Sequence, residues 1–244
     1  MSKLNTLFLS CATALSLPVV ADDIKNYQSF SGYTGLINIP NAEVELYGSA
    51  NVGFNNQLDL RGVKYVDGYN YIFAAGLFKG LEVSGQIASS TMNDNMFANA
   101  ENRGQLRDLS FNTKYQIPFI PQKWFSLAVG AKDLGGASNK YETYYVVASK
   151  DLWDFRFSAG VGTSEKLTGK MDGVFAGIEW QPFEWFSLLT EYDAEAVNAA
   201  ARITVPKKWL YDIGELTFTS RFYSSTDFSK DKDSYWGVNF SLPL

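Results

Sequence analysis

Apolar and polar residues alternate with a period of two over most of the chain beyond its first fifty residues. The last segment is the clearest example: Trp236, Val238, Phe240 and Leu242 alternate with Tyr235, Gly237, Asn239 and Ser241. Successive side chains of a β-strand point to opposite faces, so this pattern predicts a strand with one apolar face and one mainly polar face.

We identify twelve such segments of roughly ten residues, the length that a tilted strand needs to cross a membrane. They cover residues 49–60, 69–78, 80–90, 107–117, 124–133, 141–150, 153–162, 173–181, 185–193, 197–205, 214–223 and 234–242. The segments at 69–78 and 141–150 alternate poorly, because both of their faces are apolar.

The connections between these segments differ in length on the two sides. Short ones at 78–80, 117–123, 150–152 and 181–184 alternate with long ones at 61–68, 91–106, 134–140, 163–172 and 224–233, with 206–213 and 194–196 as exceptions. Five of the six tryptophans fall on the short side, and tyrosines with Trp236 fall on the other. Two levels of aromatic residues are typical of membrane interfaces. We therefore predict an all-β, transmembrane, antiparallel up-and-down barrel of about twelve strands.

The amino terminus indicates export. Lys3, an apolar run and Val19-Val20-Ala21 form a signal peptide over residues 1–21. We expect a periplasmic, plug-like segment at 22–46 and the barrel at 47–244, as a monomer in the Gram-negative outer membrane. The only cysteine, Cys11, is expected to leave with the signal peptide.

Charged residues lie on the faces that should point away from lipid. We expect a lumen charge network of Lys114, Lys132, Arg156, Glu179, Glu191, Arg202, Glu215 and Arg221. Buried charges must be paired or hydrated, so the lumen is either a salt-bridged, partly filled interior or a polar, sugar-binding conduit. Glu179 and Glu191 could also form a carboxylate pair for glycoside hydrolysis, but neighbouring arginines explain them more simply.

Composition restricts the remaining chemistry. The chain has no histidine, which removes the usual general base, and without mature cysteine it lacks the usual ligands of zinc and copper. We therefore expect no enzyme activity, no cofactor and no metal. The net charge of −5 argues against a nucleic-acid partner.

Two resemblances add to this interpretation. Tyr235, Gly237, Phe240 and Leu242 are similar to the terminal signal that the barrel-assembly machinery recognises in outer-membrane barrels. The phrase Gly35-Leu36-Ile37-x-x-Pro40-x-Ala42 resembles the opening of the YjbH-like outer-membrane family, and Glu191-Tyr192-Asp193 is similar to the end of one of its strands. Judged from the residues alone, the opening phrase is a periplasmic turn, Glu191 is a lumen charge and Asp193 is a loop acid.

The family resemblance implies a shortened, single-barrel form that takes part in exopolysaccharide or capsule secretion. It also implies polysaccharide, periplasmic proteins and lipoproteins as partners, beside the outer-membrane lipids. The leading hypothesis is a non-enzymatic secretion or assembly component. A small-solute pore remains open, as does a structural or adhesive protein whose loops at 91–106 and 224–233 bind a partner.

Overall fold

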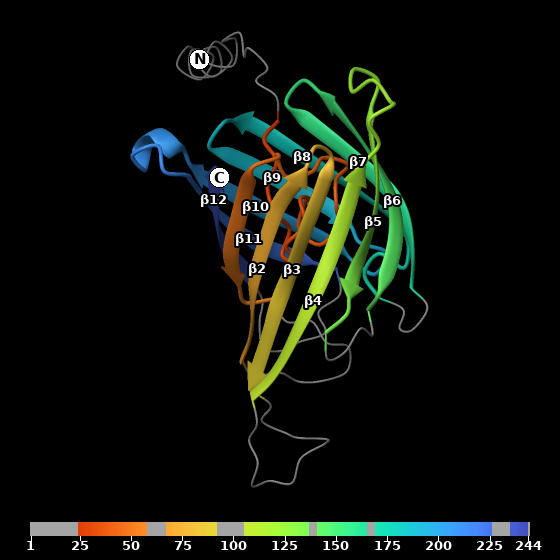
Figure 1. The fold of residues 1–244 in the computed structure, drawn as a ribbon, viewed down its shortest axis with the longest axis vertical. Coiled ribbons are helices and arrows are strands. Elements are labelled where there is room, and N and C mark those ends of the chain that lie inside the picture. Colours follow the sequence, from red (N-terminus) through yellow and green to blue (C-terminus); the bar gives the residue numbers. More distant parts are fainter. Residues whose placement is uncertain are drawn as a thin grey trace, which may run out of the picture.

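Twelve strands form one closed antiparallel barrel (Figure 1). Each strand pairs with the next in sequence, and β12 pairs with β1. The structure is a computed structural model that describes residues 24–57, 67–91, 105–136, 141–164, 169–225 and 235–243. The prediction of a twelve-stranded up-and-down barrel is confirmed, whereas the predicted signal peptide lies outside the described residues.

The strands agree with the predicted segments to within a few residues, except that the first ends earlier. They are β1 (Ser49–Asn55), β2 (Asp67–Phe78), β3 (Leu81–Thr91), β4 (Gln105–Gln116), β5 (Ser126–Leu134), β6 (Thr143–Leu152), β7 (Phe155–Ser164), β8 (Gly173–Phe183), β9 (Phe186–Tyr192), β10 (Val197–Val205), β11 (Glu215–Ser224) and β12 (Tyr235–Pro243). A short 3-10 helix, η1 (Lys207–Trp209), follows β10. Among the described residues, no helix is long and apolar enough to cross a membrane.

The first and last strands close the barrel. β1 and β12 pair from Ser49↔Pro243 to Asn55↔Gly237, so neither strand leaves a free edge along this seam. In β12, Tyr235 is buried, whereas Trp236 on the opposite face is exposed. The alternation found in the last ten residues of the sequence therefore separates the inside of the barrel from its outside.

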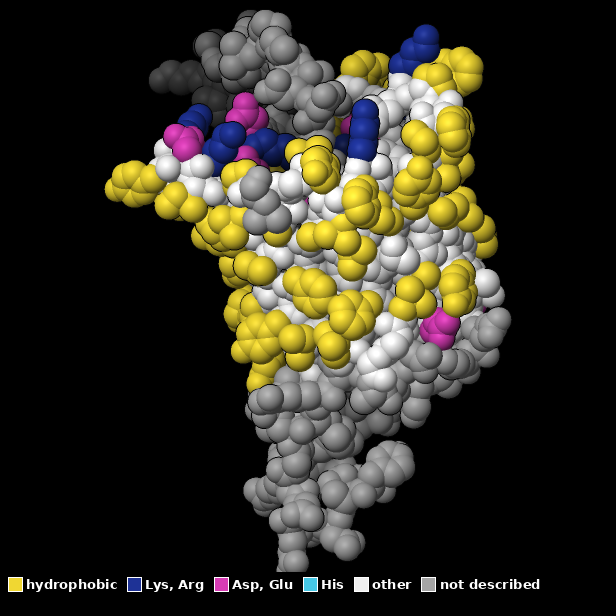
Figure 2. Space-filling view, in the orientation of Figure 1, with side chains coloured by type: hydrophobic (Ala, Val, Ile, Leu, Met, Phe, Trp, Pro, Cys, Tyr) yellow, Lys and Arg dark blue, Asp and Glu magenta, His cyan; other side chains and the backbone are white. Residues whose placement is uncertain are grey.

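Large apolar side chains cover the outer wall (Figure 2). Val174, Tyr71 and Val161 each expose more than half of their surface, which is unusual for a protein surrounded only by water. Trp124, Trp153, Trp185 and Trp209 are exposed at the end of the barrel that carries the short turns. Trp153 was expected to begin a strand, but it lies in the turn before β7 with a φ of 54°.

Residues 24–45, which we call the inner segment, lie inside the ring of strands (Figure 1, red to orange). The segment reverses direction twice, at the bridges Gln28↔Thr34 and Gly35↔Pro40. It then leaves over the short-turn rim, where Leu46 and Tyr47 are each 73% exposed. The phrase that was interpreted as a periplasmic turn is thus buried in the lumen, and that interpretation was wrong.

The inner segment explains why some strands are apolar on both faces. In β6, Tyr144 and Val146 point outward, whereas Tyr145 and Val147 point inward and are buried. Tyr145 contacts Tyr33 of the inner segment, with ring centroids 6.4 Å apart. The inward apolar residues belong to one hydrophobic cluster that includes Leu36, Ile37, Ile39, Met171, Phe175 and Leu189. The lumen therefore has a hydrophobic core of its own.

We predict that Gly35→Ala destabilises the barrel by about 1–3 kcal/mol, because the added methyl group overpacks the second reversal of the inner segment. A Cβ at this position would lie 2.2 Å from the carbonyl oxygen of Ile39, which is backbone and cannot move aside cheaply. Urea unfolding of the detergent-refolded protein measures the effect. Gly169→Ala is the matched control, because its Cβ would meet no atom closer than 3.6 Å. Equal stability of the two variants would contradict this packing.

Candidate functional site

The carboxylate of Glu191 holds the second reversal of the inner segment. Glu191 lies near the end of β9 and is 1% exposed. It accepts the backbone N–H groups of Ile37, Asn38 and Ile39 at 2.9, 2.8 and 3.3 Å. Three consecutive amides that converge on one carboxylate form an anion-binding nest, and hydrogen bonds to an ionised acceptor are stronger than neutral ones. Backbone amides, rather than the expected arginine, thus bind Glu191.

The local sequence places these three amides on one side of the reversal. Leu36 donates its N–H to the carbonyl of Ile39 at 2.9 Å, which closes a tight turn around residues 37 and 38. The side chains of Leu36 and Ile39 pack towards Gly177 of β8, where a Cβ would lie 2.5 Å from a methyl group of Leu36. A glycine on the inner face of β8 therefore gives the turn its space.

Asp193 joins the same contact. Its carboxylate accepts the side-chain amides of Asn38 at 3.1 Å and Asn198 at 2.9 Å. It also accepts the backbone N–H of Ala196 at 2.8 Å, which fixes the short connection between β9 and β10. Asp193 was interpreted as a loop acid, and it does belong to a loop, but it is completely buried and binds the inner segment. The two phrases that resemble the YjbH-like family therefore meet in space.

Side-chain amides continue this contact towards the barrel seam. Gln57 donates to the side-chain oxygen of Asn38 at 2.6 Å, and Asn55 donates to the carbonyl of Phe30 at 2.9 Å. Asn70 of β2 donates to Asn55 at 3.0 Å. These buried amides lie at the long-loop end of the lumen, where they attach the inner segment to β1 and β2.

Arg202 of β10, the strand next to β9, also binds the inner segment. It donates to the carbonyl of Leu36 at 2.9 Å and forms an ion pair with Glu179 of β8 at 3.1 Å. Its guanidinium also lies over the ring of Tyr27, 4.9 Å from the centroid. Burial raises the pKa of the Tyr27 phenol to about 12, so this ring remains neutral.

Arg156 of β7 holds the beginning of the inner segment. It donates to the carbonyl of Ile24 at 2.8 Å and to the side chain of Asn26 at 2.8 Å. Asp151 pairs with it through two hydrogen bonds of 2.8 and 2.9 Å, the fork geometry that suits a guanidinium and a carboxylate. Arg156 and Arg202 therefore bind backbone carbonyls as well as acids.

A further attachment involves Glu82, a residue that was not among those expected from the sequence. Glu82 of β3 accepts the backbone N–H groups of Thr34 at 2.9 Å and Glu45 at 2.8 Å, and Lys114 of β4 lies 3.6 Å away. Lys114 in turn donates to the carbonyl of Thr34 at 2.6 Å. The available signal was the register: Glu82, Ser84 and Gln86 share one face of the segment at 80–90.

Glu45 ends the inner segment in a polar contact of its own. Its carboxylate accepts side-chain amides of Gln28 at 2.6 Å and Asn51 at 2.7 Å. Burial raises the pKa of Glu45, and the nearby carboxylate of Glu82 raises it further. The hydrogen bonds that Glu45 itself accepts act in the opposite direction and lower its pKa.

The remaining members of the expected charge network lie nearer the ends of the barrel. Glu215 pairs with Lys25 at 2.8 Å, and Lys132 donates to the carbonyl of Lys170 at 3.0 Å. Arg221 lies over the ring of Tyr235, 4.1 Å from its centroid. The eight residues thus form several separate attachments rather than one continuous network.

This arrangement binds a peptide segment of the chain itself. The carboxylates of Glu179 and Glu191 are buried, and both already hold hydrogen bonds from Arg202 or from backbone amides. Within the described residues, no group of three or more metal-ligating side chains could hold a metal ion.

We predict that Glu191→Gln destabilises the folded barrel by about 1.5–3 kcal/mol, because a neutral amide oxygen binds the three backbone N–H groups less strongly than a carboxylate does and an NH2 donor replaces the second accepting oxygen. Urea unfolding in detergent, followed by tryptophan fluorescence, measures the loss. Glu184→Gln removes the same charge at an exposed turn position and should change stability by less than about 0.5 kcal/mol. A Glu191→Gln barrel as stable as this control would show that the inner segment is held by other contacts.

Comparison with solved structures places this fold among known barrels. A structure described as a KdgM porin matches with a TM-score of 0.51 at 11% sequence identity, covering 80% of this chain and 99% of that chain. A second, described as a KdgM porin in complex with disordered oligogalacturonate, matches with a TM-score of 0.49 at 10% identity, covering 80% of this chain and 99% of that chain. The first likeness shows the fold alone.

Comparison by sequence is more specific. No curated protein matches significantly. The profile of the YjbH family, described as an exopolysaccharide biosynthesis protein, matches residues 27–173. The match begins in the inner segment and ends at the start of β8, so it covers more than half of the sequence and includes the first phrase that carried the resemblance. The chain belongs to the YjbH family.

Proposed function

We propose that this protein is a non-enzymatic outer-membrane barrel that takes part in exopolysaccharide secretion or assembly as a closed scaffold. Family membership supports the link to exopolysaccharide. The exposed apolar wall and the rim tryptophans support a membrane location. In this role the barrel anchors other components of the secretion apparatus, and the polysaccharide takes another path.

One observation carries the scaffold role: the inner segment is bound to the wall on several sides at once. Glu82 of β3, Glu191 of β9 and Arg202 of β10 each bind its backbone. Tyr33, Leu36, Ile37 and Ile39 are completely buried, and burial of such side chains contributes about 1.5–3 kcal/mol each. Removal of the segment would expose apolar groups and break charged hydrogen bonds at the same time.

Deletion of the gene is expected to lower the amount of exopolysaccharide at the cell surface, and a plasmid copy should restore it. The measurement is a quantitative sugar assay of the surface fraction, with an unrelated outer-membrane protein as the control for envelope integrity. Unchanged polysaccharide in the deletion strain would contradict the proposal.

A small-solute pore is the second candidate, and the fold that this chain shares with a KdgM porin favours it. A disulfide between the inner segment and the wall separates the two functions. In Leu36→Cys/Gly177→Cys the bridge would connect two positions that already touch. We expect no steady conductance in planar bilayers with the bridge oxidised or reduced, and normal polysaccharide secretion in both states.

The single variants Leu36→Cys and Gly177→Cys control for the two substitutions, the second because a Cβ at position 177 would crowd Ile39 and Thr190. A channel that opens only after reduction, or secretion that stops only in the oxidised state, would show that the segment moves and that the lumen is the path.

A further inference from the structure

The connection between β10 and β11 has a composition unlike that of a simple turn. It carries two exposed lysines, Lys207 and Lys208, and three exposed apolar side chains. Trp209 is 73% exposed, Tyr211 is 93% exposed and Ile213 is 59% exposed. The sequence already marked this connection as too long for its side of the barrel, and nothing in the scaffold role uses it.

The connection is a built structure rather than a slack loop. Trp209 donates its N–H to the carbonyl of Pro206 at 2.9 Å, and both Leu210 and Asp212 donate to the carbonyl of Lys207, at 2.8 and 2.9 Å. Tyr211 and Asp212 have φ angles of 55° and 61°, in the left-handed region that costs a non-glycine residue energy. The backbone is therefore locally strained at Tyr211 and Asp212, in a conformation that leaves the Tyr211 side chain exposed.

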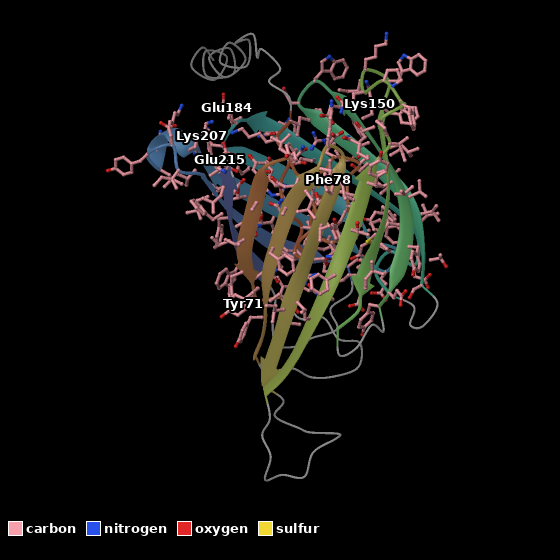
Figure 3. The ribbon with its side chains drawn as sticks, viewed as in Figure 1. Tyr71, Phe78, Lys150, Glu184, Lys207 and Glu215 are labelled. Carbon is pink, nitrogen blue, oxygen red and sulfur yellow. The ribbon has the colours of Figure 1, made fainter. Side chains whose placement is uncertain are left out.

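The connection stands away from the barrel wall at the short-turn rim (Figure 1, blue). Figure 3 shows Lys207 at the same rim as Lys150 and Glu184, far from Tyr71 on the outer wall. Trp124, Trp153 and Trp185 are exposed in other turns of this rim. Because it projects sideways, the connection is placed to contact the surface of the surrounding membrane.

Its charge selects among membrane components. Within the described part of the chain, neither Lys207 nor Lys208 takes part in an ion pair. The connection also carries one exposed carboxylate, Asp212, which leaves it with a net charge of +1, and the nearby carboxylate of Glu215 is already paired with Lys25. Tryptophan and tyrosine favour the level of the lipid headgroups, and lysines near a membrane surface are attracted to anionic lipids. Together these side chains match the phosphate of an anionic headgroup with acyl chains beside it.

We propose that residues 206–213 bind the headgroup of an anionic phospholipid in the leaflet at the short-turn end of the barrel. The inference rests on the membrane location in the proposed function, and it adds a specific lipid contact to it. Trp209, Tyr211 and Ile213 enter the interface, and the two ammonium groups pair with the phosphate.

The test is a titration of the purified, detergent-solubilised barrel with phosphatidylglycerol and with phosphatidylcholine, read by native mass spectrometry. Wild type should prefer phosphatidylglycerol. Lys207→Gln/Lys208→Gln should lose roughly fivefold in affinity for that lipid with each lysine removed, since one lysine near an anionic surface contributes on this scale. Its affinity for phosphatidylcholine should not change.

Lys170→Gln is the matched control, because it removes one lysine from a connection at the opposite end of the barrel. It should leave phosphatidylglycerol binding within about twofold of wild type, and circular dichroism confirms that each variant is folded. Equal phosphatidylglycerol affinity in wild type and the double variant would overturn this inference alone. A wild-type barrel that stays dissolved without detergent would instead contradict the membrane location, and the lipid contact with it.

Discussion

The backbone of the inner segment is buried inside the barrel, and its polar groups need partners there. A buried N–H or carbonyl group without a partner costs about 1–3 kcal/mol, so a chain that crosses the lumen must be matched by its wall. Here the wall supplies charged side chains: Glu82 and Glu191 accept backbone N–H groups, and Lys114, Arg156 and Arg202 donate to carbonyls. The path of the inner segment therefore depends on where the strands place these charged side chains, and the charged side chains are satisfied by the backbone of the segment.

Hydrophobic packing acts on the same interface. A twelve-stranded barrel is too wide for its own side chains to fill as an eight-stranded one is filled, and narrower than the large aqueous porins. The inner segment occupies this intermediate space with Tyr33, Leu36, Ile37 and Ile39, which pack on apolar residues of the wall. Such a wall suits a permanent protein core better than a water-filled path, which is why we favour a scaffold over a conduit.

The two phrases that resemble the YjbH-like family form one contact in this structure. The first forms the turn that presents three amides, and the second supplies the carboxylates of Glu191 and Asp193 that bind the turn. They lie about 150 residues apart in the sequence and act as a single contact. The resemblance therefore marks a contact that holds the inner segment in the lumen, and we propose that its relation to exopolysaccharide passes through the structure of the barrel.

The sequence by itself determined the strands, their number, their order and, wherever the period of two is clear, which side chains face outward. A period of two requires only local geometry and one apolar face, and alternating short and long connections are typical of barrels of the outer-membrane type. It did not determine what lies in the lumen. Tyr145 and Val147 obscured the period of β6, because they pack on residues of the inner segment more than a hundred positions away. The N–H groups that bind Glu191 belong to the backbone, and every residue except proline has such a group, so the sequence could not identify them. Only the tertiary structure could decide that the charged lumen surrounds a peptide segment, because that choice depends on where the chain before β1 folds back.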